Sequence, residues 1–214
     1  MTRLLVLSRA AVGPKMASPG IRAYQLAGAL GRALPAAEIT LAVPEDRGGV
    51  PQPAPNVRLE VWPDHGGAIA LARAHDVSIA RNFPPQFARL LGHTRFALDA
   101  FTPLYIEWME LSKRDILPRW RRTWMAGNRW YLNFQLTLSD FIFCADERQR
   151  DLWIGMLMAL ALVPPEVYER DPSLRRLIDI VPYGVPQHPL DPRGPVLKGV
   201  VPNIKAIWWH GSDW

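Results

Sequence analysis

The chain has 214 residues, of which 49% are hydrophobic and 21% are charged. This balance is typical of a globular protein with a sizeable core. No stretch approaches about eighteen consecutive apolar residues, and the N-terminus lacks the charged region and apolar block of a secretory signal. We therefore expect a cytoplasmic protein in which the single cysteine, Cys144, is a small buried side chain.

The net charge of +5 is concentrated in residues 113–130. That window has one anion, Asp115, and six cations, which are Lys113, Arg114, Arg119, Arg121, Arg122 and Arg129. Such a patch favours phosphate groups or an anionic membrane surface. Because no nucleic-acid recognition motif accompanies the charge, we expect no nucleic-acid partner.

The first hundred residues alternate between strand-like and helix-like segments. Short apolar or alternating runs predict strands at 3–8, 38–43, 56–62, 76–80 and 94–100. Apolar residues at helical spacing predict helices at 21–34, 68–74 and 85–91. This alternation is typical of βαβ units and hence of a parallel sheet.

The following residues continue the pattern. We expect a helical region at 105–138 interrupted near Pro118, a strand at 139–144, helices at 146–162 and 165–177, and a strand at 179–182. The predicted fold class is therefore α/β, with a doubly wound, mostly parallel, Rossmann-like sheet spanning residues 1–184. Residues 185–195 contain four prolines and read as a linker, and a strand at 206–209 is expected to begin a second, truncated domain.

A long loop at residues 9–20 separates the first strand from the first helix. Loops of this length commonly bind ligands, and this one is followed by Arg22. The loop residues Gly13, Ser18, Pro19 and Gly20 suit a phosphate or sugar, since glycine lets the backbone approach a ligand closely. A turn packed by Pro19 is the alternative, with Ser18 as a helix-start signal.

Carboxylates follow the fifth predicted strand. Asp99 ends that strand, and Glu107 lies on the helix that Pro103 begins. Carboxylates placed in this way hydrogen-bond sugar hydroxyls or act as a general base, so Asp99 and Glu107 are the candidate catalytic residues. An acidic N-terminal cap that interacts with the helix dipole explains Glu107 as well.

Other reaction classes lack their motifs. The sequence contains no G-x-S-x-G, no phosphate-binding G-x-x-x-x-G-K-[ST] loop and no H-E-x-x-H, and its five histidines show no metal-ligand spacing. We therefore expect no metal site. Trp120 and Trp124 share one helix face, which either packs against the sheet or forms an interfacial surface with the neighbouring arginines.

Five segments, in this order, resemble the N-terminal half of GT-B glycosyltransferases of the GT4 (group 1) type. They are SPGIRAYQLAGAL, LDAFTPLYIEWMEL, FIFCADERQRDLWIGML, IVPYGVP and IWWHGSDW. The resemblance implies a two-domain enzyme with a sugar or lipid-linked sugar acceptor on the N-terminal domain. The nucleotide-sugar donor would lie on the C-terminal domain, with no bound cofactor or metal.

By this resemblance, residues 13–20 and Arg22 form the acceptor-side and phosphate-facing loop, and Asp99 and Glu107 are cleft residues. Arg81 and Asn82 stand where some relatives have a catalytic histidine. The donor-binding carboxylate pair of the family has no counterpart before residue 214, so we expect little transfer activity from this chain alone.

The sequence allows two interpretations of the chain. In the first, it is the acceptor half of an enzyme. In the second, it is a non-catalytic sugar-binding or scaffolding protein that pairs with a separate donor domain or with itself. A nucleotide-dependent reductase would need a dinucleotide fingerprint that the sequence lacks. Residues 113–130 predict peripheral contact with the inner face of a membrane.

Overall fold

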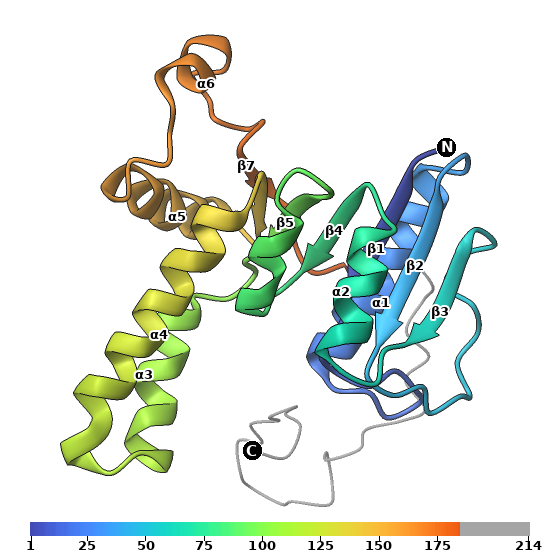
Figure 1. The fold of residues 1–214 in the computed structure, drawn as a ribbon, viewed down its shortest axis with the longest axis horizontal. Coiled ribbons are helices and arrows are strands. Elements are labelled where there is room, and N and C mark those ends of the chain that lie inside the picture. Colours follow the sequence, from blue (N-terminus) through green and yellow to red (C-terminus); the bar gives the residue numbers. More distant parts are fainter. Residues whose placement is uncertain (185–214) are drawn as a thin grey trace, which may run out of the picture. The chain divides into compact units, whose positions relative to one another are not determined.

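Seven parallel strands form one sheet in the computed structural model, which describes residues 1–184 (Figure 1). The strands are β1 (Arg3–Leu7), β2 (Glu38–Val43), β3 (Val57–Val61), β4 (Val77–Ala80), β5 (Arg95–Asp99), β6 (Phe141–Cys144) and β7 (Ile178–Ile180). Their order is β3-β2-β1-β4-β5-β6-β7, and every neighbouring pair is parallel. The predicted α/β class with a doubly wound sheet is confirmed. The linker expected at 185–195, the strand at 206–209 and the start of a second domain lie outside the described residues.

Helical segments connect the strands. They are α1 (Ser18–Ala33), α2 (His65–Arg73), the 3₁₀ helix η1 (Pro85–Leu90), α3 (Leu104–Asp115), α4 (Pro118–Leu138), α5 (Glu147–Ala159) and α6 (Pro165–Arg170). Because all strands run the same way, their carboxyl ends meet at one edge of the sheet. The strand order reverses direction between β1 and β4, which creates a crevice at that edge.

The two faces of the sheet carry separate cores, since successive side chains of a strand point to opposite sides. Leu4 and Val6 of β1 belong to a cluster that includes Ala27 of α1. Leu5 and Leu7 belong to the larger cluster on the other face, to which α2, η1, α4 and α5 contribute. Apolar residues thus cover both faces, which explains why the strands β1 and β2 read as almost continuous hydrophobic runs.

Three of the predicted helix assignments need correction. Helix α1 begins at Ser18 rather than Ile21, so the preceding loop is shorter than expected. The segment predicted as a helix at 85–91 is a 3₁₀ helix, in which the Phe87 N–H donates to the Pro84 carbonyl, and it ends before Gly92 at φ 81°. The helix expected over 165–177 ends at Arg170, because the carboxylate of Asp171 accepts the N–H groups of residues 173 and 176 and stabilises a turn.

Helix α5 shows what the segment ADERQR does structurally. The Asp146 carboxylate accepts the Gln149 N–H at 2.9 Å, and the Gln149 side chain accepts the Ala145 N–H at 3.2 Å. These reciprocal bonds cap the first turn of the helix. Arg150, which is buried, donates to the Ile178 carbonyl at 3.0 Å and so ties α5 to β7. The residues that carry the resemblance most strongly therefore also stabilise the fold.

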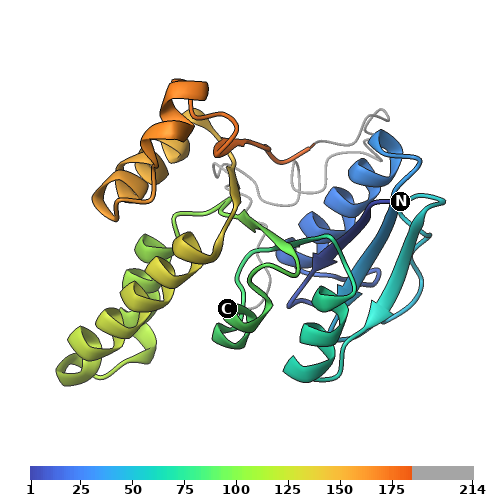
Figure 2. The ribbon, with the colours of Figure 1, turned by 45° about the horizontal axis from the view of Figure 1, so that its top comes forward.

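Helices α3 and α4 form a hairpin that extends beyond the strands in both views of the ribbon (Figures 1 and 2). Trp120 of α4 is 55% exposed, and neither Trp120 nor Trp124 belongs to either core cluster. The interpretation in which both indoles pack against the sheet is therefore wrong. Among the described residues, no helix combines the length and apolarity that a membrane crossing requires.

Candidate functional site

A pocket of about 270 Å³ occupies the crevice between the carboxyl ends of β1 and β4. Open α/β sheets commonly bind their ligands in this position. Residues 6–10, 79–82 and α1 form much of its walls, and the charged or polar side chains in its lining are Ser8, Arg9, Arg22, Arg81, Asn82 and Asp99. The pocket lining therefore combines three cations with one carboxylate, one amide and one hydroxyl group.

Arg22 and Asp99 form a bidentate ion pair in the wall of this pocket. Nε of Arg22 donates to one carboxylate oxygen at 2.6 Å, and Nη2 donates to the other at 2.8 Å. Both side chains are at least nine-tenths buried. Because Arg22 lies on α1 and Asp99 ends β5, this pair holds the first helix against the carboxyl end of a strand on the far side of β4.

Arg22 also anchors the segment that follows β7. Its guanidinium donates to the carbonyl of Val181 at 3.0 Å, and its carbon Cζ lies 5.0 Å from the centre of the Tyr183 ring. The hydroxyl groups of Tyr183 and Ser18 are 3.2 Å apart. The first turn of α1 and residues 181–183 are thus fastened together next to the pocket.

A second ion pair lies close by. Nη2 of Arg81 donates to the Glu107 carboxylate at 2.7 Å and to the Thr102 hydroxyl at 2.9 Å. The guanidinium carbons of Arg22 and Arg81 are each 4.8 Å from the centre of the Phe101 ring. Within the described residues, Nε of Arg81 is buried and has no hydrogen-bond partner. Because both guanidinium groups contact the Phe101 ring, this side chain joins the two ion pairs through cation–π contacts.

Burial raises the pKa of the Asp99 carboxyl above its ordinary value, whereas the hydrogen bonds and charge of Arg22 act in the opposite direction. Both oxygens of Asp99 are occupied by Arg22, and Glu107 is occupied by Arg81. A general base needs a free lone pair within reach of a substrate proton. In this arrangement both carboxylates position arginines, and Arg22 is buried with its donors already engaged. Arg9, Arg81 and Asn82 are the groups left to contact a ligand.

The predicted site residues separate into two groups. The pocket brings together Pro19, Arg22, Arg81, Asn82 and Asp99. Glu107 does not line the pocket and reaches it only through Arg81.

The other three predicted loop residues, Gly13, Ser18 and Gly20, lie outside the pocket lining. A Cβ atom on Gly20 would lie 2.6 Å from the Ala11 carbonyl oxygen, and one on Gly13 would lie 2.7 Å from Cβ of Arg47. Both glycines thus allow close contacts within the chain. Ser18 is the first residue of α1, but Ala17 occupies the capping position and no side chain caps the helix.

Sequence reasoning missed Arg9 and Phe101. Arg9 is two residues beyond β1, and its guanidinium donates to the Asn82 side chain at 3.3 Å. Phe101 is two residues beyond β5 and is buried between the charged groups. Their position just after parallel strands was the available signal, because all such positions meet at one edge of the sheet.

In the described part of the chain, no side chains are arranged as a metal-ligating cluster, and the buried histidine and cysteine are not arranged for catalytic chemistry. No cluster of histidine, cysteine, aspartate and glutamate side chains there has the geometry of a metal site. His75 is buried and contacts the Thr40 hydroxyl at 2.8 Å and the Leu71 carbonyl at 2.6 Å. Burial raises the pKa of Cys144 to about 11, so its thiol is protonated at neutral pH.

Searches against protein-family models and curated proteins find no match to this chain. Guanidinium groups donate in a planar fork that matches phosphate and carboxylate oxygens, and they also donate to hydroxyl groups. Combined with the Asn82 amide, they suit a small ligand that is rich in oxygen.

Proposed function

We propose that this chain binds the sugar acceptor of a GT-B glycosyltransferase of the GT4 type. The observation that carries the proposal is the pocket at the crevice between β1 and β4, with Arg9, Arg22, Arg81 and Asn82 in its lining. A sugar or the sugar end of a lipid-linked acceptor offers hydroxyl and phosphate oxygens to the Arg9, Arg81 and Asn82 side chains. The resemblance of five segments to that family supports the same assignment.

The pocket volume is consistent with a small ligand. At about 270 Å³ it lies just below the range of about 300–1,000 Å³ that is typical of small-molecule sites. The nucleotide-sugar donor would bind to a separate domain, as the resemblance implies. The role proposed for Arg22 and Asp99 is to position the pocket wall, and Arg81 and Asn82 would contact the acceptor.

A non-catalytic sugar-binding role is the second candidate, and one observation favours it. The pocket carboxylate, Asp99, and the neighbouring Glu107 are each paired with an arginine, so within the described residues neither of them is a free base at the pocket. In an enzyme, the base would then have to come from the acceptor itself or from another domain. Transfer of a sugar from a nucleotide-sugar donor, measured with and without a separate donor domain, distinguishes the two roles.

The binding test uses the purified chain with glucose, glucose 1-phosphate and UDP-glucose as probes. We expect glucose 1-phosphate to shift the backbone amide signals of residues 9, 22, 81 and 82 in NMR spectra. Arg81→Met should weaken this binding at least about tenfold, because a hydrogen bond to a charged ligand group is lost. The matched control is Arg89→Met, which changes an exposed arginine of η1 outside the pocket lining.

Two results would contradict the proposal. If none of the sugar probes shifts the pocket residues, the assignment of a sugar acceptor fails. If UDP-glucose binds in the pocket far more tightly than glucose 1-phosphate, the domain is a nucleotide-binding module rather than the acceptor side.

A further inference from the structure

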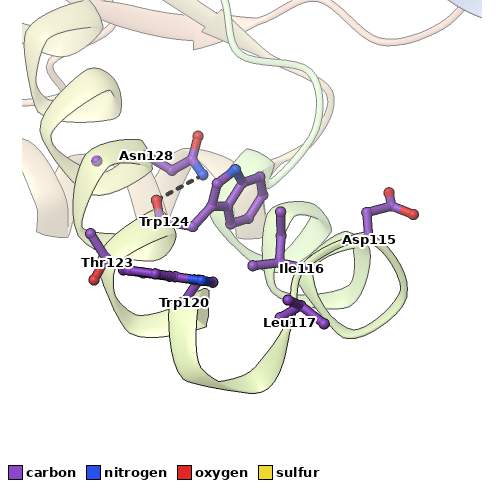
Figure 3. A pocket seen from close by; sticks show the side chains of 8 residues that line it. Asp115, Ile116, Leu117, Trp120, Thr123, Trp124 and Asn128 are labelled. Carbon is purple, nitrogen blue, oxygen red and sulfur yellow. Dashed lines mark hydrogen bonds between the residues drawn. The ribbon is translucent and has the colours of Figure 1, made fainter.

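The tip of the α3–α4 hairpin carries apolar side chains that no other described part of the chain covers. Trp120 and Trp124 project from α4 toward Ile116 and Leu117, which come from the connection between the two helices (Figure 3). Together they line an open groove of about 590 Å³. Leu117 is 60% exposed and Trp120 is 55% exposed. Exposed apolar groups of this size, gathered in one place, mark a site of interaction.

Helix α4 also carries cations without acidic partners, and two of them, Arg119 and Arg122, lie in its first turns at the tip. Among the described residues, no carboxylate forms an ion pair with Arg119, Arg122 or Arg129. The two nearby acids are already neutralised, since Glu110 pairs with Lys113 and Asp115 pairs with Arg114. The tip therefore combines exposed indole and leucine side chains with an uncompensated positive charge.

The connection between the helices is held in a defined shape. Arg121 donates to the carbonyls of Ser112 at 3.0 Å, Lys113 at 2.9 Å and Ile116 at 3.2 Å. This arginine caps the last turn of α3 and ties α4 to it. The apolar groups at the tip are thus presented by a rigid support.

The apolar and cationic groups are arranged in neighbouring stripes along α4. Trp120, Thr123, Gly127 and Trp130 recur at helical spacing and share one face, and Trp130 is 60% exposed. Arg119, Arg122 and Arg129 recur in the same way beside them. A helix with this pattern is typical of an interfacial helix that lies at the level of lipid headgroups.

We propose that the tip surface, defined as Leu117, Arg119, Trp120, Arg122 and Trp124, inserts into the headgroup region of an anionic lipid bilayer. Indole rings and guanidinium groups both combine an apolar body with a polar edge, so they fit the layer between headgroups and acyl chains. Anionic phosphate groups complement the unpaired arginines. This inference stands independently of the proposed sugar-binding function.

The test measures sedimentation of the full chain with vesicles of phosphatidylcholine alone or mixed with phosphatidylglycerol, at low and high salt. We expect binding only to the anionic vesicles, and weaker binding at high salt. The double variant Arg119→Gln/Arg122→Gln should bind about 25-fold more weakly, since each cation near an anionic surface contributes about fivefold. Leu117→Ser/Trp120→Ser should weaken binding without changing its dependence on salt.

Matched controls carry the same changes elsewhere. Arg89→Gln/Arg148→Gln removes two exposed arginines, and Leu91→Ser/Tyr168→Ser removes two exposed apolar groups. Both controls should bind vesicles within about twofold of the unaltered chain, and circular dichroism checks that all variants fold. The proposal is overturned if anionic vesicles are not bound, or if the controls lose as much binding as the tip variants. It is also overturned if the tip variants abolish self-association of the chain, measured by light scattering, while vesicle binding is unchanged.

Discussion

Arg22 and Asp99, 77 positions apart in the sequence, meet in a buried bidentate ion pair at the carboxyl edge of the sheet. The pair connects α1, β5 and the segment after β7, because Arg22 also donates to the Val181 carbonyl. It is at once a wall of the candidate pocket and a support of the fold.

Removing one member of the pair should destabilise the protein strongly. We expect Arg22→Met to lower the free energy of unfolding by about 3–5 kcal/mol, because it leaves the Asp99 carboxylate buried without a partner. Urea denaturation measures this change. The control Arg89→Met, at an exposed site, should stay within about 0.5 kcal/mol of the unaltered chain. Equal effects of both substitutions would show that the ion pair contributes nothing specific.

The same variant should depend on pH in a defined direction. Burial already raises the pKa of Asp99, and Arg22 opposes that rise, so Arg22→Met should raise the pKa further. The folded state then binds a proton that the unfolded chain, with a pKa near about 3.9, releases. The free energy of unfolding of Arg22→Met should therefore fall as pH rises above about 4.

The reference for this pH dependence is Arg22→Met/Asp99→Asn, which cannot bind that proton. We expect the difference in unfolding free energy between the single and the double variant to vary with pH between about 4 and 8. Urea denaturation at several pH values measures it. A constant difference would mean that Asp99 keeps an ordinary pKa in the folded state.

Two glycine substitutions should act in opposite directions. A Cβ atom on Gly20 would lie 2.6 Å from the Ala11 carbonyl oxygen, so Gly20→Ala should destabilise the protein by about 1–3 kcal/mol. A Cβ atom on Gly127, inside α4, meets nothing within 4 Å. Gly127→Ala should stabilise the protein by about 0.5–1 kcal/mol, since alanine favours a helix interior. Thermal unfolding compares the two, and a stabilising effect at Gly20 would contradict the close contact.

The thiol of Cys144 should be unreactive in the folded protein. It is buried at the end of β6, and burial raises its pKa to about 11. Because only the thiolate reacts with iodoacetamide, we expect almost no modification at pH 8 until the chain unfolds. Mass spectrometry before and after addition of guanidinium chloride measures this. Rapid modification of the folded chain would show that β6 opens readily.

The pattern of hydrophobic residues predicted all seven strands and the fold class. A strand buried on one face has alternating apolar residues and a strand buried on both faces has a continuous apolar run, so local sequence is sufficient to recognise it. The two β-strand neighbours of Asp99, Leu98 and Ala97, are buried on opposite faces. The helix ends were predicted less well. Helix α1 begins at Ser18, with Ala17 in the capping position, so Pro19 and Gly20 belong to the helix and the start expected at Ile21 was wrong.

For the candidate site, too, the sequence predicted some features and left others to the tertiary structure. The sequence predicted that Asp99 ends a strand and that Arg81 follows one, so that both lie at the carboxyl edge of the sheet. Which groups they contact depends on how strands and helices are arranged around them, since Arg22 reaches Asp99 across β4 and Arg81 reaches Glu107 on α3.

The sequence by itself predicted the α/β class with a mostly parallel sheet and determined the cationic character of residues 113–130, because composition and periodicity are local properties of the chain. The order of the strands came only from the structure. Only the tertiary structure decided that both carboxylates at the pocket are paired with arginines, and that Trp120 lies at an exposed hairpin tip instead of on the sheet. An amphipathic pattern predicts that one face of a helix is buried, but it does not determine which element of the fold covers that face. Here α3 covers one side of α4, and the indole at the tip is left exposed.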